Sequence, residues 1–378
     1  MAKTELIRAP EALTPLTPWT DTHWAHVSEE SLADHSSKPR LCSAALLPFK
    51  DAKPDWEGFA RSIRWMLEAA ARYGVELVPV LNADTGYIFQ LDAPLYAEVL
   101  QRFRAEFPDT RFIAGVTARG AEADSGFRAE RYRPLLDIVQ SHENCEVMLM
   151  TSRHLDGLAP EKRRDGYYEI AEWLVRPGIV HALEPSFVPW ATPFSPWLLL
   201  QLAKHPKFVA GKISTLDEPH FLYWTAMCRD LGLDFQPHSG DDFGIPTAIR
   251  MGMPLLIGAA SSAAPLICAA KDLWLDDSSP NKRFRTESGG GFDTRVYKLF
   301  EAIQSMEDQV FRLDSHGSAS AYKHSTAHVL HLLGLIAATE THPDCVDRRG
   351  PDESERMREA LQRPFRVAAR LGIPFAPN

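Results

Sequence analysis

Short apolar runs alternate with longer segments whose apolar residues recur every three or four positions, from about residue 40 to about residue 275. The short runs are typical of buried strands, and the longer segments are typical of amphipathic helices. In the first helical segment, for example, Phe59, Ile63 and Met66 fall on one face. The pattern predicts strands over 41–47, 77–81, 112–116, 147–150, 179–183, 208–213, 235–238 and 255–257. It predicts helices over 56–73, 93–107, 129–139, 167–175, 196–203, 218–231, 243–251 and 264–275.

Eight strand–helix units in about 235 residues match the size of a closed parallel barrel with right-handed crossovers. A doubly wound open sheet is the alternative arrangement for such an alternation. No G-x-G-x-x-G motif follows any of the predicted strands, so the sequence lacks the dinucleotide-binding turn typical of that arrangement. The predicted fold class is therefore α/β, a (β/α)8 TIM barrel with a C-terminal helical subdomain.

Three further regions flank this repeat. Residues 1–39 are rich in Pro, Thr, Ser and His without sustained periodicity, and we interpret them as an N-terminal extension. The barrel is assigned to 40–275, and a polar, glycine-containing loop or linker to 276–292. Helical patterns over 294–313, 319–337 and 353–371 predict a helical subdomain across 293–378.

The charge balance favours a small-molecule function over binding to a polyanion. The chain has 378 residues, with 41 basic and 50 acidic side chains and a formal charge of −9. This balance argues against broad electrostatic contact with nucleic acid or an anionic membrane. No apolar stretch approaches the roughly 20 residues that span a bilayer, and no secretory signal is visible. Five widely spaced cysteines without a C-x-x-C pair indicate free thiols, and a cytoplasmic location is expected.

Chemistry in a parallel barrel is carried by the carboxyl ends of its strands and the loops that follow them. Lys212 is the most informative residue there, because it lies near the end of the apolar strand 208–213. Desolvation would favour its neutral amine, which can attack a carbonyl carbon and form an imine. The structural alternative is a lysine that reaches solvent or pairs with Asp241.

Other polar residues fall at equivalent positions after neighbouring strands. Asp84, His181 and His238 are candidate proton-transfer groups, while the hydroxyl of Thr85 and the backbone amide of Gly86 suit an anionic substrate group. Two further candidates for substrate binding are Asp241 and Ser261, and no metal ligand set is assigned.

Several segments together resemble the dihydrodipicolinate synthase/N-acetylneuraminate lyase family of class I aldolases. Leu46-Leu47-Pro48-Phe49 is similar to the family's T-P-F, and Asn82-Ala83-Asp84-Thr85-Gly86 to its G-T-T-G-E. Glu184-Pro185-Ser186 resembles the N-x-P-S region. Val209-Ala210-Gly211-Lys212-Ile213-Ser214 resembles the strand with the imine lysine, and Ser239-Gly240-Asp241-Asp242 resembles the G-[ND]-D loop.

The resemblance implies a lyase or aldolase, or a hydratase-aldolase, that acts on a 2-oxo acid such as pyruvate. It implies a covalent imine on Lys212 with no separate cofactor, Thr85 and Gly86 at the substrate carboxylate, and a homo-oligomer. No nucleic-acid or membrane partner is expected.

The sequence departs from the family's pattern at the residues that move protons and bind the second substrate. Ala182 stands where the family has a tyrosine, and Asp84 replaces the first threonine of its T-T pair. Tyr87 replaces a glutamate, and Phe187 replaces the arginine that pairs with a carboxylate. These changes predict altered chemistry on a less polar substrate. Because side chains alternate along a strand, only one of His181 and Ala182 faces the site.

Two other interpretations are compatible with the sequence. One is a metal-dependent barrel hydrolase or isomerase that uses His154, His181, Glu184, His238 and Asp242, although the first strand has no H-x-H. The other is a member of the family that keeps the fold and binds a ligand without catalysis. Its motivation is the missing tyrosine at Ala182.

Overall fold

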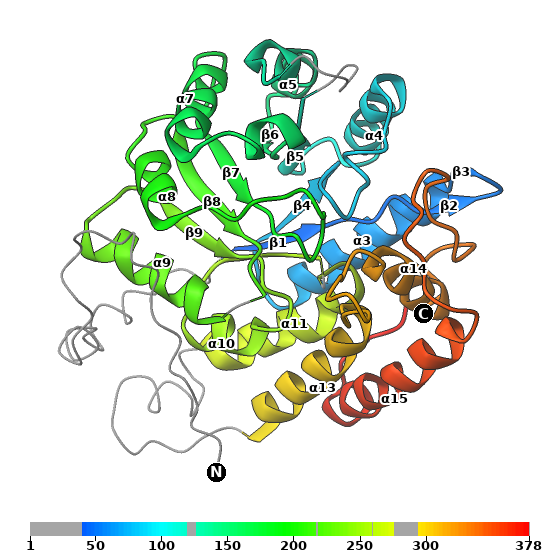
Figure 1. Cartoon of the computed structure of the whole chain (residues 1–378). Helices are drawn as coiled ribbons and strands as arrows, with labels where there is room; N and C mark the ends of the chain where they lie inside the picture. Colours follow the sequence, from blue (N-terminus) through cyan, green and yellow to red (C-terminus); the bar gives the residue numbers. More distant parts are fainter. Residues whose placement is uncertain (1–39, 119–125, 217, 259, 276–293, 378) are drawn as a thin grey trace.

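Eight parallel strands close into a barrel in the order β1-β10-β9-β8-β7-β6-β5-β4 (Figure 1). The computed structural model describes residues 40–377 except 119–125, 217, 259 and 276–293. The barrel strands are β1 (Leu41–Ala44), β4 (Leu77–Leu81), β5 (Phe112–Val116), β6 (Cys145–Leu149), β7 (Gly178–Ala182), β8 (Phe208–Ile213), β9 (Gln236–Ser239) and β10 (Leu255–Ile257). All eight predicted strands are present, and the predicted TIM barrel is confirmed.

Helices follow the strands and surround the barrel. They are α3 (Trp56–Arg72), α4 (Ala93–Glu106), η1 (Ala129–Tyr132), α5 (Arg133–Gln140), α6 (Arg153–Asp156), α7 (Pro160–Ala171), α8 (Pro196–Ala203), α9 (Glu218–Asp230), α10 (Ile245–Arg250) and α11 (Ala260–Leu275). Local sequence sets several of their starts. Asp55, Asp92 and Ser195 accept hydrogen bonds from the first-turn amides of α3, α4 and α8.

The structure corrects some of the predicted bounds. The helix expected over 167–175 is α7, which begins at Pro160, a residue suited to the first turn because it has no amide proton. The first strand ends at Ala44, and the chain then forms a small antiparallel hairpin of β2 (Phe49–Lys50) and β3 (Lys53–Pro54). Asp51 and Ala52 at its tip have positive φ angles of 51° and 58°.

The C-terminal region is helical, as predicted. It contains α13 (Thr294–Val310), α14 (Tyr322–Leu332) and α15 (Glu353–Leu371). Helix α13 packs against α11 and α15. Figure 1 shows α13, α14 and α15 gathered beside α3 and α11. The predicted extension 1–39 and linker 276–292 lie outside the described residues.

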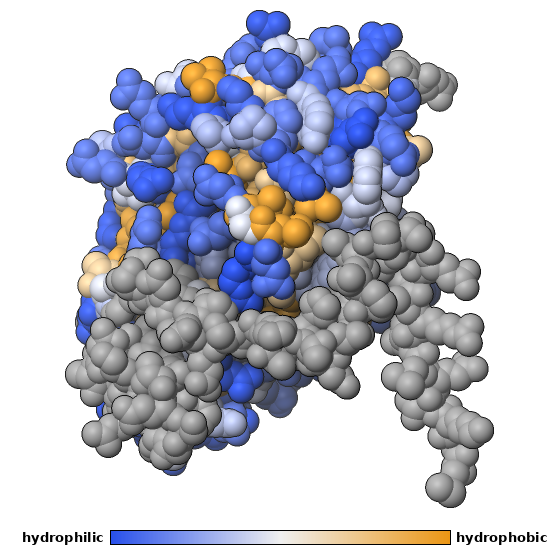
Figure 2. Space-filling view, turned by 90° about the vertical axis from the view of Figure 1, so that its left-hand side faces the viewer, coloured by the Kyte–Doolittle hydropathy of each residue, from blue (hydrophilic) through white to orange (hydrophobic). Residues whose placement is uncertain are grey.

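Apolar side chains from the strands, the helices and the C-terminal region form one continuous buried cluster. Figure 2 views the molecule from the side of α8 and α9 and shows a mostly hydrophilic surface with limited apolar areas. No helix in the described ranges is long and apolar enough to cross a membrane. The five cysteines are buried and unbridged.

Candidate active site

Lys212 lies on the next-to-last position of β8, at the carboxyl end of the barrel, and its side chain is 7% exposed. The backbone at Gly240, just after the neighbouring strand β9, comes very close to it. A Cβ atom on Gly240 would lie 2.9 Å from Lys212 Cε and 2.7 Å from Ser214 Oγ. A residue larger than glycine at position 240 would therefore displace the Lys212 side chain or the backbone around it.

Burial shifts the protonation equilibrium of Lys212 toward the neutral amine. Burial lowers the pKa of Lys212, while the carboxylates of Asp242 and Asp84 act in the opposite direction. The ammonium of Lys323 adds a smaller lowering effect on the same pKa. The net result is a lysine whose pKa lies below its usual range, as imine chemistry requires.

Asp84 and Thr85 reach the same region from the turn that follows β4. This turn contains two non-glycine residues with positive φ, Asn82 at 48° and Tyr87 at 62°. Such backbone conformations cost energy and persist where surrounding contacts hold them. Here the Asn82 side-chain amide donates to the carbonyl of Tyr96 over 3.1 Å, which fixes the start of the turn.

The C-terminal helix α14 supplies two groups that sequence reasoning missed. The Tyr322 hydroxyl lies 2.9 Å from Thr85 Oγ1 and donates to Asp84 Oδ2 over 2.8 Å. Lys323 Nζ lies 3.0 Å from the other oxygen of Asp84, and both members of this ion pair are buried. The only sequence signal was a tyrosine and a lysine next to each other at the start of an otherwise ordinary helix.

Contacts with the loop after β7 hold the start of α14 over the barrel. The backbone amide of Ala319 donates to the carbonyl of Ser186 over 2.7 Å, and Ser318 Oγ donates to the same carbonyl. The ring of Tyr322 stacks on Phe311, with centroids 4.7 Å apart, and meets Phe187 edge to face. The aromatic loop at Phe187 therefore packs on the C-terminal region.

Lys212, Asp84, Thr85 and Tyr322 line a narrow cavity at the carboxyl end of the barrel. The space open to the centre of a water-sized sphere is about 10 Å³, roughly what one water molecule needs. A substrate must therefore displace some of the side chains around it. The lining residues are Asp84, Thr85, Leu183, Phe187, Lys212, Ser214, Gly240, Asp242, Gly258, Phe311 and Tyr322.

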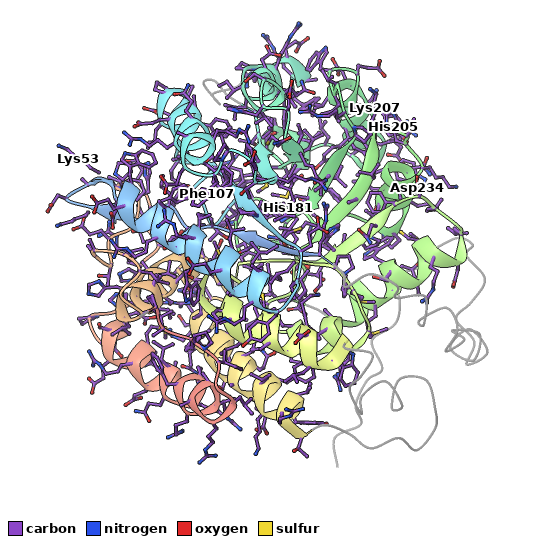
Figure 3. All side chains as sticks on the ribbon, turned by 180° about the vertical axis from the view of Figure 1, so that it is seen from behind. Lys53, Phe107, His181, His205, Lys207 and Asp234 are labelled. Carbon is purple, nitrogen blue, oxygen red and sulfur yellow. The ribbon has the colours of Figure 1, made fainter. Side chains whose placement is uncertain are left out.

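His181 faces the inside of the barrel, on the same face of the sheet as Lys212, because the strand register pairs the two residues. Figure 3 labels it near the middle of the barrel. Its Nε2 lies 2.8 Å from Ser214 Oγ, and its Nδ1 lies 2.9 Å from the sulfur of Met150. Burial, aided by Lys212, holds the pKa of His181 well below its usual range. The imidazole thus contacts the cavity wall through Ser214, while Ala182 faces the other way.

The remaining candidates lie outside the cavity lining. His238 Nε2 accepts a hydrogen bond from Arg40 Nε over 3.0 Å, which turns the ring toward the residue that precedes β1. Asp241 Oδ1 accepts from the Phe243 amide, and Ser261 Oγ donates to the Gly258 carbonyl. Gly86 packs against the backbone of Asn82. In the loop after β9, the carboxylate that lines the cavity is therefore that of Asp242.

The residues considered for a metal centre do not converge. Across the described ranges, no three or more His, Cys, Asp or Glu side chains are grouped so that they could hold a metal ion. His238 is engaged by Arg40, and His181 by Ser214 and Met150.

Comparison with known proteins finds similarity at the level of structure only. No protein-family model matches the sequence, and the search of curated proteins finds no match. A monomeric variant of dihydrodipicolinate synthase superposes with a TM-score of 0.68 at 15% identity, over 88% of this chain and 99% of its own. A dihydrodipicolinate synthase from Acinetobacter baumannii, solved with pyruvate, gives a TM-score of 0.66 at 19% identity, over 87% and 99%.

The similarity extends to a lyase with a different substrate in its name. An N-acetylneuraminate lyase from Fusobacterium nucleatum gives a TM-score of 0.64 at 13% identity, over 86% of this chain and 98% of its own. In all three comparisons the superposition covers 86–88% of this chain and nearly the whole of the neighbour. This chain therefore has the fold of the dihydrodipicolinate synthases and N-acetylneuraminate lyases, which confirms at the level of fold the resemblance found in its motifs.

Proposed function

We propose that this protein is a carbon–carbon lyase of the class I aldolase type, a divergent member of the dihydrodipicolinate synthase/N-acetylneuraminate lyase family, and that Lys212 forms an imine with a 2-oxo acid. The observation that supports this most directly is the buried Lys212 amine in a cavity shared with Thr85, Asp84 and Tyr322. Desolvation increases the neutral fraction of an amine, which is its nucleophilic form, and hydroxyl groups beside it suit a carbonyl oxygen or carboxylate.

The reaction begins with attack of the Lys212 nitrogen on the C2 carbonyl carbon of the substrate. A carbon–nitrogen bond forms, the oxygen leaves as water, and the two protons lost by the amine end on that water. When the C3–C4 bond of a 4-hydroxy-2-oxo acid breaks, the C4 hydroxyl loses its proton and an aldehyde departs. The electron pair of the C3–C4 bond forms a C2–C3 double bond, and the imine nitrogen takes up the proton from the C4 hydroxyl, which gives a neutral enamine. Protonation at C3 and hydrolysis then release pyruvate and the free lysine.

The covalent imine is itself the electron sink, so we propose no separate cofactor. Thr85 and the Gly86 amide are the proposed carboxylate-binding groups, although only Thr85 lines the cavity before substrate enters. A homo-oligomer, a cytoplasmic location and the absence of nucleic-acid and membrane partners remain predictions from sequence.

The substrate is proposed to be less polar than aspartate semialdehyde. Phe187 lines the cavity at the position where the family's pattern has an arginine, and its ring packs on Phe311 and Tyr322. An apolar wall provides no cationic partner for a second carboxylate. We therefore expect poor turnover of pyruvate with aspartate semialdehyde, and better turnover of 4-hydroxy-2-oxo acids or arylidene pyruvates in a side-by-side assay.

Borohydride trapping tests the central claim. Incubation with pyruvate followed by borohydride should add one reduced pyruvyl group to the intact mass, and peptide mapping should locate it on Lys212. Because the pKa of Lys212 is lowered, the rate of labelling should rise with pH and level off below the pKa of an ordinary lysine.

Lys212→Met should abolish the label, whereas Lys207→Met, which alters a lysine of the preceding loop bonded to the Leu174 carbonyl, should leave it in place. An unchanged wild-type mass across pyruvate, 2-oxobutyrate and a 4-hydroxy-2-oxo acid would contradict the proposal. That result would leave ligand binding without imine chemistry as the function of the fold.

A further inference from the structure

Four side chains beside Lys212 form one continuous series of polar contacts. Thr85 Oγ1 lies 2.9 Å from the Tyr322 hydroxyl, which lies 2.8 Å from Asp84 Oδ2, and Asp84 Oδ1 lies 3.0 Å from Lys323 Nζ. All four residues are at least nine-tenths buried. Three of them, Thr85, Tyr322 and Asp84, line the cavity that Lys212 enters.

The chemistry of the groups fixes the direction of these hydrogen bonds. An ionised carboxylate only accepts, so the single proton of the phenol points to Asp84. The phenol oxygen is then the acceptor for the hydroxyl proton of Thr85. The ion pair with Lys323 keeps Asp84 as the acceptor at the end of this series. A proton that enters at Thr85 or Tyr322 can thus pass to Asp84 and return.

We infer that Tyr322, delivered by helix α14, is the acid–base residue of the Lys212 site and passes protons between the substrate oxygen and Asp84. This inference rests on the proposed function. The strand residue expected to hold a phenol is Ala182, which has none, and its side chain faces away from Lys212. The structure supplies a phenol to the same cavity from a helix more than a hundred residues later in the chain.

The proton balance of imine formation shows what Tyr322 would do. As the Lys212 nitrogen attacks C2, the phenol gives its proton to the carbonyl oxygen and recovers one from the nitrogen by way of Asp84 or Thr85. A second such cycle protonates the hydroxyl of the carbinolamine, and the carbon–oxygen bond breaks to release water. Both protons come from the amine, and Tyr322 ends as the neutral phenol.

His181 is the competing candidate inside the barrel, and its geometry suits the role less well. Its two ring nitrogens already contact Met150 and Ser214, and it does not line the cavity. Burial also raises the pKa of Tyr322 well above its usual range, so the phenol holds its proton before substrate binds.

The test compares Tyr322→Phe with Tyr168→Phe, a control that removes a tyrosine hydroxyl outside the site, bonded to the carbonyl of Gln201. Pyruvate is mixed with each protein, samples are quenched with excess borohydride at timed intervals, and intact mass gives the labelled fraction. We expect Tyr322→Phe to slow labelling by about 10²- to 10⁴-fold and the control to change it less than threefold. The final labelled fraction should be unchanged, because an acid–base catalyst alters the rate and not the equilibrium.

Labelling of Tyr322→Phe at the wild-type rate, or faster, would overturn the inference while leaving the Lys212 imine intact. A wild-type protein that no 2-oxo acid labels would overturn both proposals. If Tyr322→Phe does not fold, Asp84→Asn provides a second test, because it removes the group that takes the phenol's proton. A wild-type rate of labelling in Asp84→Asn would equally reject the role of Tyr322. If both variants fold, the double variant should be no slower than the slower single one.

Discussion

The position of Lys212 depends on its close packing against Gly240, a residue without a side chain. The α-carbon of Gly240 faces Ser214 Oγ, the Ile213 carbonyl and Lys212 Cε, all within 3 Å of where a Cβ would lie. The strands β8 and β9 are paired at this point, with Ile213 opposite Ser239, so neither backbone has room to retreat. A single missing methyl group thus allows the lysine, Ser214 and the loop with Asp242 to occupy one small space.

We predict that Gly240→Ala slows borohydride-trapped labelling by pyruvate and lowers the free energy of unfolding by about 1–3 kcal/mol. The added methyl group would force Lys212 or the loop after β9 to move. Timed labelling and urea unfolding measure the two effects. Gly157→Ala is the matched control, because Gly157 adopts an ordinary helical backbone with φ of −74°. Equal labelling rates for Gly240→Ala and the wild type would contradict this account of the site.

Helix α13 carries a buried carboxyl group into the region behind the cavity. Glu307 is fully buried, and its Oε1 accepts a hydrogen bond from Ser262 over 3.4 Å. Within the described residues, its second oxygen has no hydrogen-bond partner. Burial, together with the negative charge of Asp242, raises the pKa of Glu307 well above its usual range. Burial at this position of α13 therefore favours the protonated form of Glu307.

We predict that Glu307→Gln stabilises the protein by about 1–2 kcal/mol at pH 8 and has little effect near pH 4.5. A folded-state pKa above the unfolded value gives stability that is present below about pH 4.3 and is lost as the pH rises toward the folded value. The amide removes that loss because it does not ionise. Thermal unfolding across pH 4.5–8 measures the difference.

Glu301→Gln on the exposed side of α13 is the control for this experiment. Its ion pair with Arg363 is solvent-exposed, so its loss should change stability by less than about 1 kcal/mol. A Glu307→Gln variant that is less stable than the wild type at pH 8 would show that the ionised carboxylate is favoured inside the fold.

At the scale of the whole molecule, two neutral imidazoles lie inside the barrel. Burial, with a contribution from Arg40, lowers the pKa of His238 to about 3, and burial also lowers that of His181. The unfolded chain would protonate both near the ordinary value of about 6.5. Their contribution to stability is therefore present above about pH 6.5 and is lost as the pH falls toward the folded values.

We predict that the free energy of unfolding falls between pH 6.5 and pH 5, with each of these histidines contributing up to about 1.4 kcal/mol per pH unit. Urea unfolding at several pH values measures the slope. His238→Gln, which can keep a contact with Arg40, should reduce the slope, whereas His316→Gln at an exposed position should not. A slope unaffected by His238→Gln would mean that His238 is protonated in the folded protein.

The barrel itself could be predicted because its signal is local and repeated. Apolar runs such as 77–81 and 208–213 mark strands. The segments between successive strands have helical periodicity, which is typical of the helices that connect parallel strands. Helix ends were less accurate, as at Pro160, because capping and packing outside the periodic stretch set them. Lys212 and Thr85 could be proposed as site residues for the same reason, since strand ends in a barrel meet at one mouth.

Sequence by itself therefore determined the eight-unit barrel and the helical C-terminal region. It also determined that Lys212 lies near the end of the sixth barrel strand, β8. Only the tertiary structure decided which groups share a cavity with that lysine. Tyr322 and Lys323 reach Asp84 across more than two hundred residues of chain. The ring of His238 bonds to Arg40 and lies outside the cavity lining, and His181, not Ala182, faces the inside of the barrel. Periodicity reports which face of an element is buried, whereas the partners that meet inside depend on register and on how the C-terminal helices close over the barrel.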